Sequence, residues 1–382
     1  MSSNEGVVRA QKAAAVIAPL AATIEESRRL PREAVDALVA ARVFRLAVPR
    51  VYGGDEADVA TLIDVVETIA RADGSAGWCA MIGSTSGLMS VFVEEGVARE
   101  IYGPEDAITC GVTAPTAVAT KTTGGYRVTG RWAFASGCEH SGWRMGGAIV
   151  DGEPPLPSGM PSPRCMIFRA EDTRVVDTWT TSGLRGTGSH DLEVNDAFVP
   201  AGRSFSLLGE RSARFGGVCA MPFFGLLATS VAAVAVGIAR GALDAFVALA
   251  AAKQPLGARR TIAHRELVQL DVARAEAKIR GARALLHDAA GEAEDESKRG
   301  DGASLRTRAS LRAAAAHATS EAASAVDLVY HAAGASGVYA KSPLQRHFRD
   351  VHVATQHVMV APTAAVLAGR ILLGLETDAT LL

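Results

Sequence analysis

Residues 124–132 read GGYRVTGRW, and this stretch decides the fold of the middle of the chain. A glycine pair followed by residues of high strand propensity is typical of a tight hairpin turn that leads into a β-strand. Working outward, short apolar runs predict further strands at 147–150, 165–168, 192–194 and 197–200. Residues 106–210 are therefore predicted to form a β-domain.

The sequence on both sides of this zone has the pattern of helices. In residues 1–105, apolar side chains recur at helical spacing after Leu30 and Pro31. Beyond residue 210 the chain is rich in alanine, and four long segments are predicted as helices: 224–252, 262–292, 304–333 and 344–375. Four long helices with short connections predict a bundle over residues 211–382. The expected class is a multi-domain α+β protein.

The composition of the 382-residue chain excludes several classes of protein. It is 48% hydrophobic and 21% charged, as folded globular proteins are. Its 39 Lys and Arg residues are balanced by 41 Asp and Glu, so no basic excess favours a nucleic-acid partner. The five cysteines are an odd number without a C-x-x-C pair, which argues against a disulfide framework or a metal site. This cysteine usage predicts a cytoplasmic protein.

Two apolar segments resemble membrane or export signals. Residues 215–239 carry no charged side chain but are rich in Ala and Gly, which favours a buried helix of the bundle over a membrane span. Residues 13–22 resemble part of a signal peptide, but Pro19 interrupts the run and acidic residues flank it. We therefore expect no membrane partner.

The most conspicuous glycine motif, GLRGTG at 183–188, has the wrong spacing for a dinucleotide fingerprint, and no helix is predicted after it. The sequence also has no phosphate-binding G-x-x-x-x-G-K-[ST] loop, no G-x-S-x-G elbow and no H-E-x-x-H zinc motif. Phosphoryl transfer, serine hydrolysis and zinc-dependent proteolysis therefore lack their usual sequence support.

Several short strings carry a family resemblance. They are LP at 30–31, VPRVYGG at 48–54, ETIARADGS at 67–75, GGYRVTGRW at 124–132, FVP at 198–200, GIARGAL at 237–243, GASG at 334–337 and RD at 349–350. In this order they resemble the acyl-CoA dehydrogenase superfamily over nearly the whole chain. The resemblance implies an N-terminal helical domain (1–105), a central β-barrel-like domain (106–210) and a C-terminal four-helix bundle (211–382). It also implies a homotetramer with flavin at the subunit boundaries.

The chain departs from the dehydrogenases of this superfamily at their catalytic base. Their glutamate usually lies nine residues after the Arg of the RD pair, and that position here is Val358. The alternative position, near 225–229, holds GLLAT and also has no carboxylate. Because a carbon acid next to a thioester needs a positioned base, acyl-CoA dehydrogenation is disfavoured. An acyl-CoA dehydrogenase with a displaced base and a non-catalytic flavin-fold scaffold remain as alternatives.

Three further strings resemble the two-component flavin-dependent monooxygenases. They are FASGCEH at 134–140, GLRGTGSHD at 183–191 and QRHFRDVHVATQH at 345–357. The resemblance implies reduced flavin (FADH2 or FMNH2) from a separate flavin reductase. With O2 it would oxygenate a small aromatic or amine substrate through a C4a-hydroperoxide. It also implies that Ser136 lies beside flavin N5 and that His357 lies over the oxygen-reacting face.

The chemistry of these two residues fits such roles. A hydroxyl hydrogen-bonded to N5 slows the loss of peroxide, and a histidine can either protonate the peroxide or deprotonate the substrate. The ordinary alternatives are that Ser136 is only a turn residue and that His357 is a buried histidine on the apolar face of a late helix. His352 lies five residues before His357, out of phase on a helix, so the pair is a poor metal site.

The resemblance also implies further flavin contacts. Thr113 lies where the dehydrogenases have a Thr-Glu-Pro string that borders the flavin ring. Trp132 is predicted either as a wall of the flavin site or as a core residue. His190, in the glycine-rich loop, is either a structural cap or a cofactor contact. A pyrophosphate loop of the neighbouring subunit is implied at Gly334, Ser336 and Gly337. FAD and FMN both remain open, and the substrate-binding residues are unknown.

Overall fold

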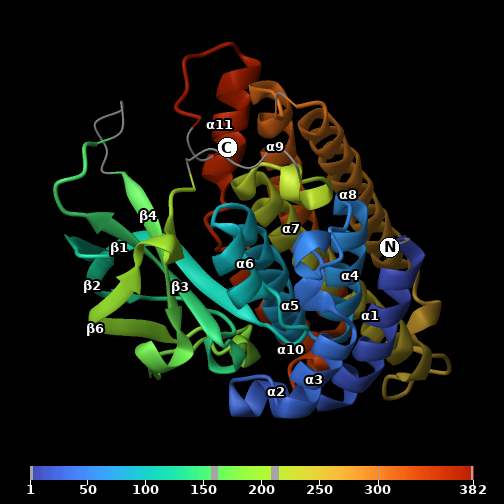
Figure 1. Cartoon of the computed structure of the whole chain (residues 1–382). Coiled ribbons are helices and arrows are strands. Elements are labelled where there is room, and N and C mark those ends of the chain that lie inside the picture. The colour runs from blue at the N-terminus through green and yellow to red at the C-terminus, as the bar shows by residue number, and fades with distance from the viewer. Residues whose placement is uncertain (1–2, 156–161, 208–214, 301, 380–381) are drawn as a thin grey trace.

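The computed structural model describes residues 3–155, 162–207, 215–300, 302–379 and 382. A β-sheet lies on one side of the molecule and the helices lie on the other (Figure 1). The N-terminal helices are α1 (Ser3–Ile17), α2 (Ala21–Ser27), α3 (Arg32–Ala40), α4 (Val59–Ala72), α5 (Gly74–Ser86) and α6 (Glu95–Tyr102). The C-terminal helices are α7 (Phe223–Ala252), α8 (Glu266–Lys298), α9 (Leu305–Ala333), α10 (Pro343–Ala354) and α11 (Pro362–Leu372).

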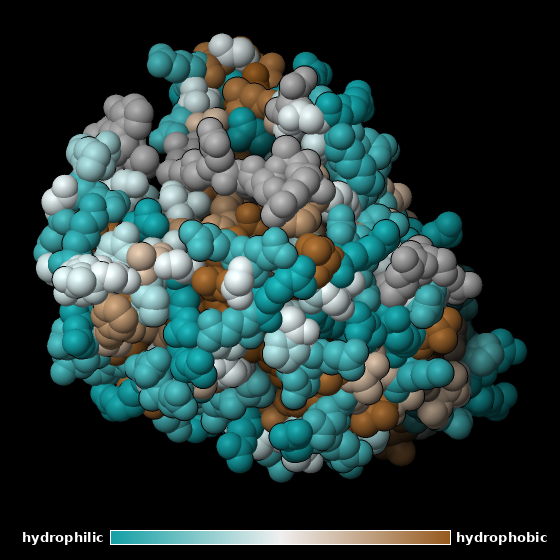
Figure 2. Space-filling view, viewed as in Figure 1, coloured by the Kyte–Doolittle hydropathy of each residue, from teal (hydrophilic) through white to brown (hydrophobic). Residues whose placement is uncertain are grey.

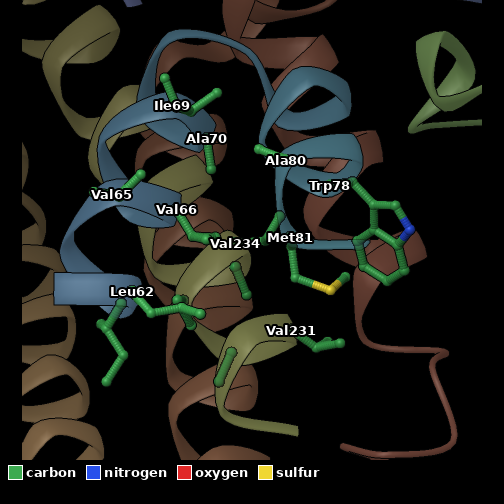
Figure 3. Close-up of a cluster of buried hydrophobic side chains, with 14 of the residues drawn as sticks. Leu62, Val65, Val66, Ile69, Ala70, Trp78, Ala80, Met81, Val231 and Val234 are labelled. Atoms are coloured by element: carbon green, nitrogen blue, oxygen red, sulfur yellow. The ribbon is translucent and has the colours of Figure 1, made fainter. Parts of the chain in front are cut away.

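Helices α4 and α5 form the centre of the N-terminal helical region. Each begins at an aspartate whose carboxylate accepts a backbone N–H of the first turn: Asp58 from Thr61 at 2.7 Å, and Asp73 from Ala76 at 2.9 Å. The apolar side chains of α4 face α5 and α7 in a shared core, whereas Trp78 projects from the other side of α5 (Figure 3). The core thus fixes the direction in which Trp78 points.

The strands are β1 (Thr109–Thr122), β2 (Gly125–Trp132), β3 (Trp143–Val150), β4 (Pro163–Arg169), β5 (Arg174–Val176), β6 (Asp191–Pro200) and β7 (Ser204–Phe205). They form one sheet in the order β5-β6-β2-β1-β3-β4-β7. The predicted hairpin is confirmed: Thr122 pairs with Gly125, and Gly124 in the turn has φ of 80°. In this order β5 and β7 are the two edges, so the described backbone pairing leaves the sheet open.

Helix α7 is the central helix of the bundle and packs against α4, α8, α9 and α10. Within the described residues, two segments are long and apolar enough to cross a membrane by length and composition: Glu5–Ser27 and Phe223–Ala252. In the second, which is α7, 83% of the most apolar window is buried inside the protein. This burial agrees with the prediction of a buried helix, although the helix begins at Phe223 and not at residue 215.

One helix prediction was wrong. Residues 344–375 were expected to form a single helix, but α10 ends at Ala354 and α11 begins at Pro362. Pro362 disfavours helical backbone at the residue before it, and Ala361 is extended with ψ of 156°. His357 therefore lies in the turn between two helices and not on a helix face. Helix α8 also extends to Lys298, beyond residue 292, where its predicted segment ended.

The predicted division at residues 105 and 210 into three domains stays a prediction, although all described strands lie between Thr109 and Phe205.

Candidate active site

A cavity of about 420 Å³ lies where the sheet meets α5, α7 and the turn after α10. Aromatic and aliphatic side chains form most of its wall, and its polar lining residues are Thr85, Ser86, Thr113, Ser136, Thr187, Ser189, Gln356 and His357. Among the described residues, no Lys, Arg, Asp or Glu lines it. The cavity therefore brings Ser136, His357 and Thr113 together, as the sequence analysis expected of a shared site.

Ser136 begins a chain of hydrogen-bonded hydroxyl groups. Its Oγ accepts the indole N–H of Trp78 at 3.0 Å and lies 2.6 Å from Oγ of Ser189. Ser189 lies 2.6 Å from Oγ1 of Thr187, which donates to the carbonyl of Leu184 at 2.8 Å. Ser136, Ser189 and Thr187 are all at most 5% exposed. The chain is thus shielded from water except where it borders the cavity.

The end of this chain fixes the direction of every bond in it. A hydroxyl has one proton, and the proton of Thr187 is used by the carbonyl of Leu184. Ser189 must then donate to Thr187, and Ser136 must donate to Ser189. The Trp78 N–H donates to Ser136 as well. Ser136 therefore has no proton left for the cavity and offers it only a lone pair.

His357 lines the same cavity, from the turn between α10 and α11. Burial, with a smaller contribution from the positive charge of Arg312, lowers the pKa of His357 to about 4, so the imidazole is neutral at pH 7. The backbone N–H of Met359 donates to Nδ1 of His357 at 3.3 Å. The neutral ring therefore carries its proton on Nε2, which makes Nε2 a donor.

The histidine and the hydroxyl chain are linked through Trp78. The rings of Trp78 and His357 are 5.5 Å apart, with the planes at 69°. Because the Trp78 nitrogen is bonded to Ser136, one indole contacts both polar groups. This edge contact orients His357 relative to Ser136.

The glycine-rich loop at 183–188 holds the hydroxyl chain in place. A Cβ added at Gly183 would lie 2.4 Å from the backbone of Arg349, and one at Gly186 would lie 2.1 Å from Ile24. These glycines therefore allow close packing of the loop on α10 and α2. The Leu184 N–H donates to the buried carboxylate of Asp350 at 2.6 Å, which ties the loop to α10.

Trp132 does not line the cavity, so the structure supports the core alternative for this residue. Its side chain is 1% exposed, its N–H donates to the carbonyl of Gly147 at 2.7 Å, and it packs on Phe168. Of the two readings of His190, the structure shows the cap: Nδ1 accepts the backbone N–H groups of Thr178 and Trp179, each at 3.2 Å.

The remaining predicted residues lie outside the cavity. Gly334, Ser336 and Gly337 form the short turn Gly334–Gly337 after α9. A role for this turn at a neighbouring subunit's flavin stays a prediction. His352 pairs with Asp327 at 2.9 Å.

Phe134 is a cavity residue that was not predicted from the sequence. Phe134 lines the cavity, is 71% exposed and packs edge-on against Trp179 at 6.1 Å. Its φ of 67° is unusual for a phenylalanine and turns the chain out of the sheet after β2. The available signal was its position two residues before Ser136 in the FASGCEH string.

Val358 also lines the cavity, at the position where the dehydrogenases of the superfamily carry their base. In the part of the chain that the structure describes, no carboxylate lines the cavity, so the glutamate base of the dehydrogenases has no counterpart there.

Comparison with known proteins agrees with this geometry. Residues 8–98 match the model of the acyl-CoA dehydrogenase N-terminal domain, and residues 229–362 match that of the C-terminal domain. The chain is 33% identical to an indole-3-acetate monooxygenase of Pseudomonas putida, covering 92% of this chain and 89% of the relative. It is 32% identical to the oxygenase component of an FADH(2)-dependent resorcinol hydroxylase of Rhizobium sp., covering 92% and 90%.

Among solved structures, XiaF from Streptomyces sp. in complex with FADH2 and glycerol superposes with a TM-score of 0.88 at 27% identity, covering 98% of this chain and 96% of that one. The fold, the cavity without a carboxylate and these relatives agree with one another. The chain belongs to the acyl-CoA dehydrogenase superfamily, within its branch of flavin-dependent monooxygenase oxygenase components.

Proposed function

We propose that this chain binds reduced flavin delivered by a separate reductase and oxygenates a small aromatic molecule with dioxygen. Bound reduced flavin supplies two electrons, so that one atom of dioxygen enters the substrate and the other leaves as water. The observation that carries the proposal is the cavity in which the acceptor oxygen of Ser136 and the donor nitrogen of His357 share an apolar enclosure.

The role proposed for Ser136 is to accept the N5–H of reduced flavin. The hydroxyl chain leaves Ser136 only a lone pair toward the cavity, and reduced flavin has a proton at N5. Holding that proton opposes its loss, and with it the wasteful release of hydrogen peroxide. One neutral hydrogen bond of this kind contributes roughly 0.5–1.5 kcal/mol.

The role proposed for His357 is to donate from Nε2 to oxygen in the cavity. The sequence left open whether this histidine acts as an acid or as a base. A pKa of about 4 makes the ring a weak base, and the bond from Met359 to Nδ1 places the proton on Nε2. Donation is therefore the role that the geometry favours.

The flavin contacts are proposed from exposure and position. Phe134 replaces Trp132 as the proposed wall of the flavin ring, because Phe134 is exposed at the cavity and Trp132 is enclosed in the sheet. Thr113 lies on β1 at the same cavity. We propose FAD over FMN, because the relatives are named for FADH2.

We also propose that the working form is a homotetramer in the cytoplasm. Helix α11 and the residues after it expose Val366, Leu372, Leu373 and Leu375, and brown side chains are visible over α11 at the top of Figure 2. Such apolar exposure is typical of a surface covered by another subunit. All five cysteines are buried, and this cysteine usage favours a reducing compartment. Light scattering of the purified protein tests the tetramer.

The test of the function is anaerobic loading with FADH2 or FMNH2, followed by mixing with oxygenated buffer and an aromatic substrate panel. We expect tighter binding of FADH2 and an oxygenated product. A protein that binds neither reduced flavin would be a scaffold, and the proposal would fail.

A further inference from the structure

We propose that the substrate of this site is an uncharged aromatic molecule and that the cavity rejects aromatic carboxylates. The inference rests on the proposed function for the reaction, but it concerns binding alone. The names of the relatives do not indicate this restriction, because one relative is named for indole-3-acetate, which carries a carboxylate.

The walls of the cavity suit an aromatic ring. Trp78, Trp179 and Phe223 line it from three separate parts of the chain, in addition to the Phe134 ring proposed above for the flavin. The N–H groups of the two tryptophans are already bonded, to Ser136 at 3.0 Å and to the carbonyl of Leu184 at 3.0 Å. Their rings are thus left for apolar and stacking contacts.

Most polar groups of the wall are occupied. Thr85 donates to the carbonyl of Met81 at 2.8 Å, and Ser86 donates to the carbonyl of Thr109 at 2.7 Å. The protons of Ser136, Ser189 and Thr187 are used within their own chain, as argued above. For a substrate this leaves chiefly Gln356 and His357, beside Thr113, which is proposed above for the flavin, and none of these is charged at neutral pH.

No cation of the described wall is available to pair with a carboxylate. Arg312 is the cation whose charge acts on His357, but it does not line the cavity, and its guanidinium donates to the carbonyl of Met359 at 3.2 Å. Moving a carboxylate from water into an apolar site without a cationic partner is strongly unfavourable. An amide of the same shape lacks that penalty.

The test compares two ligands that differ in charge and hardly in shape: indole-3-acetamide and indole-3-acetate. The full chain is titrated calorimetrically with each at pH 7.5, with and without oxidised FAD and without reductant, so that no turnover occurs. The same is done with 4-hydroxyphenylacetamide and 4-hydroxyphenylacetate. We expect each amide to bind at least tenfold more tightly than its acid. An acid that binds as tightly as its amide, or failure of both amides to bind, would overturn the proposal.

Gln356 offers a gain-of-function test, because it is exposed at the cavity and its side chain donates to the neighbouring Thr355 at 3.0 Å and to no other group of the described chain. Gln356→Arg should strengthen acid binding at least tenfold, and the neutral control Gln356→Met should not. Equal effects of the two variants would contradict the charge argument. If the amides are preferred but no substrate is oxygenated by the FADH2-loaded protein, the proposed function fails and the binding inference stands.

Discussion

Replacing Ser189 with alanine tests the direction of the hydroxyl chain without touching the residue proposed to meet the flavin. In the wild-type protein the proton of Ser136 points to Ser189 at 2.6 Å. In Ser189→Ala that proton has no acceptor within the chain, although Trp78 still donates to Ser136. The Ser136 hydroxyl is then free to turn its proton toward the cavity and to stop acting as a pure acceptor.

The size of the effect follows from one hydrogen bond. Loss of acceptance from N5 costs roughly 0.5–1.5 kcal/mol, which corresponds to about a two- to twelvefold faster unproductive decay. The assay mixes the FADH2-loaded variant with oxygenated buffer and measures hydrogen peroxide and product per flavin oxidised. Ser136→Ala should still bind reduced flavin. Its unproductive decay should be accelerated at least as much as that of Ser189→Ala.

A matched control separates this effect from ordinary destabilisation. Ser141 is also buried, at 4% exposure, and donates to the carbonyl of Gly137 at 2.8 Å, but it does not line the cavity. Ser141→Ala and Ser189→Ala should both lower the free energy of unfolding by about 1–3 kcal/mol. Only Ser189→Ala should raise the peroxide fraction. Equal peroxide fractions in the two variants would refute the argument from the hydroxyl chain.

Four other outcomes are expected. His357→Ala should lower the product formed per flavin oxidised by on the order of 10²-fold. Because the pKa of His357 is about 4, the product yield of the wild-type protein should not fall between pH 8 and 5.5, and a decline centred near pH 6.5 would contradict this. Phe134→Ala should weaken FADH2 binding several-fold, measured by anaerobic titration, whereas Trp132→Phe should lower the melting temperature and leave FADH2 binding unchanged. Burial and a neighbouring carboxylate raise the pKa of Asp350 to about 7 from 3.8, so this residue lowers the free energy of unfolding increasingly as pH rises between those values. In urea titrations, Asp350→Asn should therefore become more stable relative to wild type from pH 5 to 8. A stability difference between the two proteins that does not change with pH would argue against the raised pKa. No acyl-CoA thioester should bleach bound FAD anaerobically, because Val358 occupies the position of the base.

The order of helices, sheet and helices could be predicted because it rests on local pattern. The hairpin at 122–125 follows from its glycines, and α7 follows from an uncharged stretch too rich in Ala and Gly for a membrane span. The break between α10 and α11 was missed. Helical periodicity continues across it, and Pro362 accounts only for the start of α11. Helix α10 already ends at Ala354, which leaves His357 in a turn and not on a helix face.

The residues of the site could be predicted only where a short local string identifies them. Ser136 and His357 were found through short strings, and they do share a cavity. Trp132 was predicted at the flavin site because a large aromatic side chain in a strand suits the wall of a cavity. The alternation of side chains along β2 directs Trp132 into the core that packs on the sheet, and the positive φ of Phe134 brings that ring to the cavity instead. Such a backbone angle cannot be predicted from the residue type.

The contacts of the glycine-rich loop with α10 could not be predicted from the sequence. Its spacing excluded a dinucleotide site, but nothing local indicated that Gly183 admits the backbone of α10 or that Asp350 holds the loop there. The same helix continues into the turn that carries His357. A shift of the loop would therefore move the hydroxyl chain and the histidine together. Because the hydroxyl chain proposed to accept a proton and the histidine proposed to donate one both adjoin this contact between loop and helix, we expect the glycines to contribute to the chemistry through packing.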